Sequence, residues 1–294
     1  MPCKSFILKL FFIVIGGMGC GGAHSDPVRS ATRLDLAKDF LRKGNLEAAE
    51  QEANRALAYQ RGNEEAENVL GLVYLVRGME DFRLLEVDGC LTGVDAESMH
   101  QDLDQALTTA DQHFARAVAF ASDFGEAWAN RGVVAIHLGN YEAASQYLST
   151  ALGFPQRLID IGIARAHLGW AYFYLGNYLK AAKELLQAYQ FRPGSCVATY
   201  RLGRVYFARK EWEKAADKFQ EVSDQPSCPL QEARLFLMKS IYERERQGSL
   251  PGSDQGDDTM ELARAACLAL SPESCIAAEC RSLGRSLPPG ATYN

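Results

Sequence analysis

Residues 168–193 read LGWAYFYLGNYLKAAKELLQAYQFRP, and this stretch decides the fold. A small residue, Gly169, precedes a run of aromatic side chains, and Gly176-Asn177 interrupts that run. Ala181 and Ala188 then follow at a spacing of two helical turns. Small residues at Gly169 and Ala181 let two antiparallel helices approach closely, and Gly with Asn suits a tight turn. The stretch therefore predicts a helical hairpin.

The same pattern recurs along the chain with a period of about 34 residues and resembles the tetratricopeptide repeat. The related stretches begin at Leu36, Leu70, Gly132 and Leu202. A single hairpin cannot bury its apolar face, so the hairpins stack. The prediction is an all-α, tetratricopeptide-repeat right-handed solenoid of about six helical hairpins plus a C-terminal capping helix.

The register divides the chain into units. We predict repeats at 30–63, 64–124, 125–161, 162–195 and 196–229, a degenerate repeat at 230–272, a cap at 273–286 and a tail at 287–294. Residues 81–102 are predicted to be an insertion between the helices of the second repeat. Such insertions map to loops on one face of a solenoid.

The N-terminus predicts export. Residues 1–19 carry Lys4 and Lys9 and an apolar run too short to span a bilayer of roughly 30 Å, as in a signal peptide. Cys20 follows directly, which resembles a bacterial lipobox and predicts a lipidated linker at 20–29. Cleavage after Ala23 is the alternative. With no Asp after Cys20, the predicted location is the outer membrane, lipid-anchored on the periplasmic face.

Composition narrows the function. Of 294 residues, 47% are hydrophobic and 23% charged, which argues against global disorder. The net charge of −6 disfavours nucleic acid as a partner. No common catalytic motif is present. We predict no catalytic residue, no metal, no cofactor and no small-molecule substrate, and a structural role for His137 and His167.

Export favours disulfides among the six cysteines beyond Cys20, although small buried thiols are the alternative. Cys196 opens the first helix of the fifth repeat and Cys228 follows its second helix, at the same end of the hairpin. Cys267 and Cys280 flank a predicted turn. These two pairs are the disulfide candidates, and Cys90 and Cys275 stay unassigned.

The resemblance to tetratricopeptide repeats implies a partner-binding groove along the first helix of each repeat. Its predicted residues are Leu72, Leu75, Val133, Ile136, Trp170, Phe173, Tyr174, Tyr200, Arg204 and Phe207. Most of them are apolar or aromatic, and an exposed patch of that kind usually marks an interaction site. The alternative is that superhelix packing, or the inserted segment folding inward, covers them.

A lipidated, exported solenoid of this length resembles the outer-membrane lipoproteins of type IV pilus biogenesis, the PilF/PilW-like pilotins. The most specific part is residues 128–216, where a lengthened link containing Pro155 joins the third and fourth repeats. The insertion and the cysteine-rich C-terminal part depart from the general pattern and favour a Tgl-like branch.

That resemblance implies a non-enzymatic protein that binds pilus secretin subunits, helps them reach the outer membrane and promotes their assembly for pilus-dependent motility. Two alternatives stay open. One is a scaffold lipoprotein of another envelope machine, for barrel insertion or polysaccharide export. The other is an enzyme accessory or unrecognised hydrolase.

Overall fold

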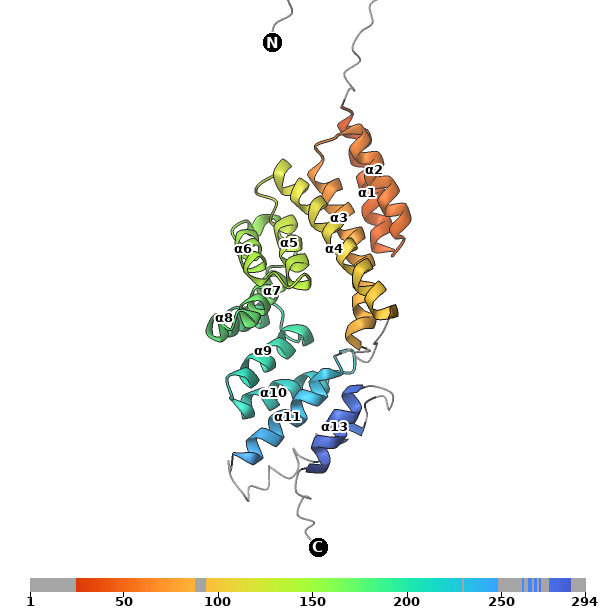
Figure 1. Ribbon diagram of the computed structural model, residues 1–294. Helices are drawn as coiled ribbons and strands as arrows, with labels where there is room; N and C mark the ends of the chain where they lie inside the picture. The colour runs from red at the N-terminus through yellow and green to blue at the C-terminus, as the bar shows by residue number, and fades with distance from the viewer. Residues whose placement is uncertain are drawn as a thin grey trace, which may run out of the picture.

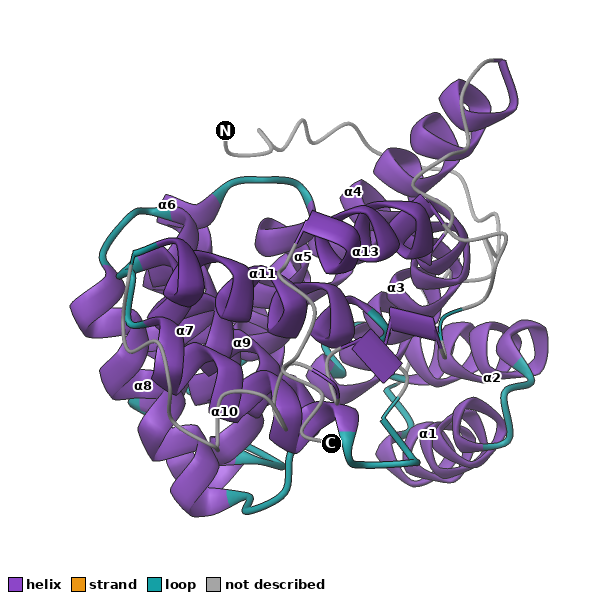
Figure 2. Ribbon diagram, turned by 90° about the horizontal axis from the view of Figure 1, so that it is seen from below, coloured by secondary structure: helices purple, strands orange, loops and turns teal. Residues whose placement is uncertain are grey.

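The computed structural model describes residues 25–87, 94–228, 230–247, 261, 264–265, 267–268, 270 and 275–286. Within these residues the chain forms helices and loops and no strand (Figure 2). The predicted signal peptide, Cys20, Cys90 and the tail at 287–294 lie outside the described residues.

Consecutive helices pair as hairpins that stack into an elongated array, with α1 and α2 at one end and α11 and α13 at the other (Figure 1). The helices are α1 Pro27–Arg42, α2 Leu46–Tyr59, α3 Glu64–Val87, α4 Val94–Phe120, α5 Gly125–His137, α6 Tyr141–Leu152, α7 Ile161–Tyr174, α8 Tyr178–Phe191, α9 Cys196–Ala208, α10 Trp212–Ser223, α11 Glu232–Arg246 and α13 Cys275–Ser286, with a 3-10 turn, η1, at Pro155–Arg157. The predicted fold class is confirmed.

The hairpin turns explain why each first helix stops where it does. Gly44, Gly139 and Gly176 have φ values of +74°, +71° and +71°, a region that favours glycine. The asparagine after each of them caps the next helix; Asn177, for example, accepts a hydrogen bond from the Lys180 amide at 3.3 Å. In the fifth repeat Lys210 takes this place with φ 61°.

Glycine also sets the spacing within the hairpins. A Cβ on Gly169 would lie 2.6 Å from Leu185 Cγ and 3.1 Å from the Ala181 carbonyl oxygen. A Cβ would likewise press on a large side chain of the second helix at three other positions: Gly71 faces Phe114, Gly132 faces Leu148 and Gly203 faces Phe219. All four of those large side chains are fully buried. The repeated small residue therefore lets one large side chain fill each hairpin seam.

Two boundaries differ from the sequence prediction. Helix α1 begins at Pro27, within the predicted linker at 20–29, because Asp26 caps it and proline suits the first helical position. The insertion predicted at 81–102 does not form a loop at its ends, because residues 81–87 and 94–102 are helical. Residues 81–87 contain no Gly or Pro, so α3 continues through them to Val87.

Both predicted disulfides are present among the described residues. Cys196 and Cys228 are joined across the fifth hairpin with their Cα atoms 6.0 Å apart. Cys267 and Cys280 are joined with their Cα atoms 5.5 Å apart, and both belong to the hydrophobic cluster that packs α10, α11 and α13 together. The disulfides therefore hold the C-terminal end of the stack.

Candidate partner-binding groove

A cavity of about 730 Å³ lies along the first helices α5, α7 and α9. We call it the groove cavity, and its lining residues come mainly from these helices. Met79 of α3 and Leu230, just before α11, also line it, so distant parts of the solenoid contribute to one site. In Figure 1 the lower ends of α3 and α4 point toward the start of α11. The lengthened α3 therefore supplies part of the wall.

Half of the predicted groove residues line this cavity: Val133, Ile136, Trp170, Tyr174 and Tyr200. Phe173 does not line it but stacks on Trp170 with ring centroids 4.7 Å apart. Leu75 lies in the hydrophobic core, and Leu72 and Phe207 pack against hydrophobic clusters and do not line the cavity. The structure therefore concentrates the site on the third to fifth repeats.

Aromatic rings form a continuous ladder at the cavity. Trp170 and Tyr174 meet edge to face at 4.9 Å, and Tyr174 stacks on Tyr141 of the preceding hairpin at 4.3 Å. Tyr174 remains 47% exposed. Large aromatic side chains bury roughly 150–250 Å² each when covered, so this ladder offers a partner substantial apolar contact area.

Arg204 lies next to the aromatic ladder. Its guanidinium carbon lies 4.1 Å from the Phe236 ring centroid, 5.5 Å from Phe173 and 5.7 Å from Trp170. The guanidinium also donates a hydrogen bond to the Tyr200 hydroxyl at 2.9 Å. Phe236 comes from α11, which sequence reasoning did not connect with the groove, because only the superhelical stacking brings α11 beside α9.

The cavity also has polar lining residues, of which His167 and Arg201 were not predicted as groove residues. His137, His167 and Arg201 all line it, and Arg201 donates to the Ala166 carbonyl at 3.2 Å. Burial, with a smaller contribution from the charge of Arg201, lowers the pKa of His137 from 6.5 to about 4. Burial also lowers the pKa of His167 well below 6.5. Both imidazoles are therefore neutral at neutral pH.

The buried imidazole of His137 predicts a loss of stability in mild acid. An unfolded histidine takes up a proton near pH 6.5 but the folded one only near pH 4, so stability falls as pH drops through that window. At pH 5 this amounts to about 2 kcal/mol relative to pH 7. Urea unfolding at both pH values should show His137→Gln losing correspondingly less stability than the unchanged protein.

The exposed His100 provides the matched control, because His100→Gln removes an imidazole that is not buried. That variant should lose as much stability as the unchanged protein. If His137→Gln loses as much stability between pH 7 and pH 5 as the unchanged protein, the buried His137 imidazole is not the cause of the loss.

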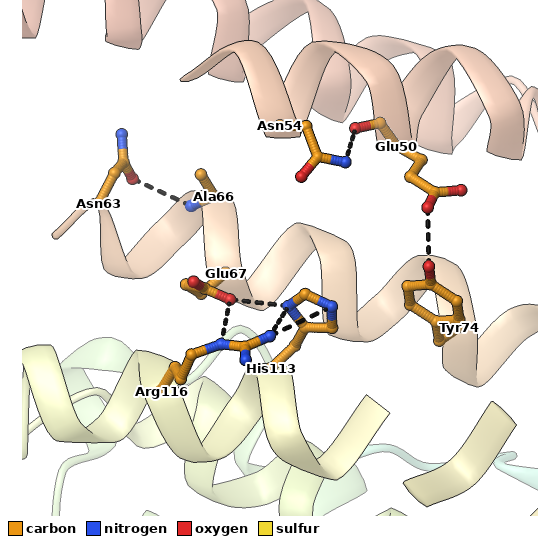
Figure 3. Close-up of polar contacts among 8 residues, drawn as sticks. All are labelled: Glu50, Asn54, Asn63, Ala66, Glu67, Tyr74, His113 and Arg116. Atoms are coloured by element: carbon orange, nitrogen blue, oxygen red, sulfur yellow. Dashed lines mark hydrogen bonds and ion pairs between the residues drawn. The ribbon is translucent and has the colours of Figure 1, made fainter. Parts of the chain in front are cut away.

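A second polar cluster joins α2, α3 and α4 (Figure 3). His113 Nδ1 lies 2.7 Å from Glu67 Oε2, and Arg116 Nε donates to the same oxygen at 3.1 Å. The Tyr74 ring stacks on His113 at 5.5 Å, and its hydroxyl donates to Glu50 at 2.7 Å. The hydrogen-bonded partners are up to 49 residues apart in sequence, so their spacing gave no signal.

This polar cluster has a structural role. Burial alone would raise the pKa of Glu67, but hydrogen bonds from His113 and Arg116 lower it below its usual range. The carboxylate is thus ionised and already occupied by two donors. The Glu67 contacts fasten α3 to α4 within the second hairpin, and the Tyr74–Glu50 hydrogen bond fastens that hairpin to the first.

No group of three or more His, Cys, Asp or Glu side chains in the described part of the chain could hold a metal ion. In the same residues, no helix combines the length and the apolarity required to cross a bilayer.

The stacked hairpins and their groove cavity define a helical-repeat scaffold of the kind that mediates protein–protein interactions. A family model described as tetratricopeptide repeat matches residues 34–79, 94–157 and 166–227, more than half of the chain. The chain belongs to the tetratricopeptide repeat family.

Two solved structures share this fold over most of their length. PilW, described as a widely conserved type IV pilus biogenesis factor, aligns with a TM-score of 0.60 and 18% identity, covering 83% of this chain and 96% of PilW. PilF of Pseudomonas aeruginosa aligns with a TM-score of 0.58 and 15% identity, covering 83% of this chain and 94% of PilF. At these identities the similarity shows the fold alone. No curated protein sequence matches the chain significantly.

Proposed function

We propose that this protein is a non-enzymatic adaptor of type IV pilus biogenesis that binds secretin subunits and promotes their assembly in the outer membrane. The observation that carries the proposal is the groove cavity with its exposed aromatic ladder. Its support is the fold shared with PilW and PilF across nearly the whole of both proteins.

The shape of the site favours a peptide segment as ligand. The cavity spans three successive hairpins and is lined largely by apolar and aromatic side chains. Apolar pockets with a few placed polar groups are typical binding sites, and Trp, Tyr and Arg are the residues that most often dominate protein interfaces. Trp170, Tyr200 and Arg204 are therefore the expected anchors.

The partner is tested by recovery from the cell envelope. The full chain, carrying an affinity tag and solubilised in detergent, should recover a pilus secretin identified by mass spectrometry. Recovery of a different envelope machine without a secretin would leave the scaffold role standing and overturn the pilus function. The assignment to the Tgl-like branch stays a prediction.

We propose further that lipid attached at Cys20 anchors the protein to the periplasmic face of the outer membrane. A cysteine that carries more than one acyl chain gives stable membrane binding, whereas a single chain binds only marginally. The variant Cys20→Ala is therefore expected to move from the membrane fraction to the soluble periplasmic fraction.

Fractionation and immunoblotting measure this shift, and Cys90→Ala serves as the matched control because it removes a cysteine outside the predicted lipobox. Retention of Cys20→Ala in the outer membrane would show that the anchor lies elsewhere.

A further inference from the structure

Arg204 is held rigidly but keeps most of its hydrogen-bonding capacity. Four aromatic rings surround its guanidinium, at centroid distances from 4.1 Å for Phe236 to 5.8 Å for Tyr200. Of the five N–H donors of a guanidinium, the hydrogen bond to the Tyr200 hydroxyl uses one. Such a planar fork matches the two oxygens of a carboxylate.

Arg204 has no carboxylate partner within the part of the chain that the structure describes. Among the described residues, no Asp or Glu oxygen lies within the 4.0 Å ion-pair distance of its guanidinium nitrogens. Glu232 of α11 is near enough for its charge to raise the pKa of Tyr200, yet it forms no ion pair with Arg204. Several other half-buried arginines of the solenoid have such partners; Arg131, for example, pairs with Asp111 at 2.9 Å.

The charges near Arg204 also favour a negatively charged ligand. The described residues that line the groove cavity include no Asp or Glu, and its two histidines are neutral at neutral pH. The chain as a whole carries a net charge of −6, so this positive site stands out against an acidic molecule. Charge complementarity of this kind sets binding specificity.

Packing alone does not require a cation at this position. A half-buried guanidinium loses hydration, and an apolar side chain of similar volume would fill the space between the rings at no such cost. The aromatic rings stabilise the cation, and the donors that they leave unused can bind a ligand group of opposite sign.

We propose that Arg204 selects a partner segment in which one Asp or Glu side chain is flanked by apolar side chains. The apolar side chains occupy the groove cavity against Trp170 and Tyr174, and the carboxylate pairs with the guanidinium of Arg204. The inference deepens the proposed function and rests on the groove being the partner-binding site.

Selection from a phage-displayed library of random dodecapeptides, with the purified full chain in detergent as bait, tests the inference without assuming a secretin. The peptides are fused through their C-termini, so an enriched carboxylate is a side chain. The unchanged protein should enrich peptides with one acidic residue between apolar residues. Arg204→Gln should lose the acidic preference and keep the apolar one. Arg209→Gln is the matched control, because Arg209 lies outside the groove cavity and already pairs with Glu211 at 2.6 Å.

The affinities of an enriched peptide, amidated at its C-terminus, then measure the coupling between its acidic side chain and Arg204. Replacing its Glu by Gln should weaken binding at least about tenfold to the unchanged protein and to Arg209→Gln. The same replacement should have no effect on binding to Arg204→Gln, and an intermediate effect with Arg204→Lys, which keeps the charge but loses the planar fork.

Two results would overturn the inference. One is that the enriched peptides are no more acidic than the starting library. The other is that replacing the peptide's Glu by Gln weakens its binding to the unchanged protein and to Arg204→Gln equally. Failure of the envelope pull-down to recover a secretin would instead overturn the pilus function and leave an acidic preference standing.

Discussion

Cells that carry Trp170→Ala with Phe173→Ala are expected to lose heat-stable secretin multimers while the protein itself stays at its normal level. Both rings are half-buried at the site, and their removal breaks the stack that supports Tyr174 and Arg204. Anchor residues of interfaces contribute about 2–4 kcal/mol each when truncated, so affinity should fall at least about a hundredfold. Immunoblots of unheated and heated envelopes measure the multimer.

Helix α8 offers the control for this experiment. Leu179 and Leu186 are 72% and 44% exposed and lie on the second helix of the same hairpin, outside the groove cavity. Leu179→Ala with Leu186→Ala removes apolar surface there and should leave the multimers intact. Normal multimers in the Trp170/Phe173 variant, with circular dichroism showing a folded protein, would contradict the groove assignment.

The substitution Gly169→Val is expected to be the most destabilising single change considered for the fold. Its Cβ would press on Leu185 and on the backbone carbonyl of Ala181, and backbone cannot move aside as a flexible side chain can. Overpacking of this kind costs about 3 kcal/mol. Thermal melting followed by circular dichroism should show a fall in Tm of roughly 6–12 °C.

Gly62 is the matched control for that experiment. The nearest atoms to a Cβ on Gly62 belong to Phe120, at 3.8 Å, which is ordinary contact. Gly62→Val should therefore change Tm by much less than Gly169→Val. Equal shifts in the two variants would show that close helix approach at Gly169 is not what the seam requires.

The hairpins could be predicted from sequence because their determinants are local. Gly176-Asn177 specifies a turn and a helix cap, and Gly169 with Ala181 specifies a close seam, all within one hairpin. The disulfides were equally local, since the two ends of an antiparallel hairpin lie together. Cys196 and Cys228 pair for that reason.

The site could be predicted only in part, because its assembly depends on how hairpins stack. The aromatic ladder of Trp170 and Tyr174 follows from positions within one helix. The contributions of Met79 and Leu230, and the ring of Phe236 over Arg204, depend on superhelical geometry that no local pattern encodes. The helical ends of the inserted segment were missed because insertions were equated with loops.

The most direct test of the central claim is photo-crosslinking from inside and outside the groove. Tyr174 can be replaced by p-benzoylphenylalanine at the cavity, and Leu179 by the same amino acid on α8, where each side chain is solvent-accessible. Irradiation of living cells should crosslink the protein to a secretin from position 174 and not from position 179. Crosslinks to a secretin from position 179 alone would place the partner outside the groove cavity and contradict the groove as the binding site.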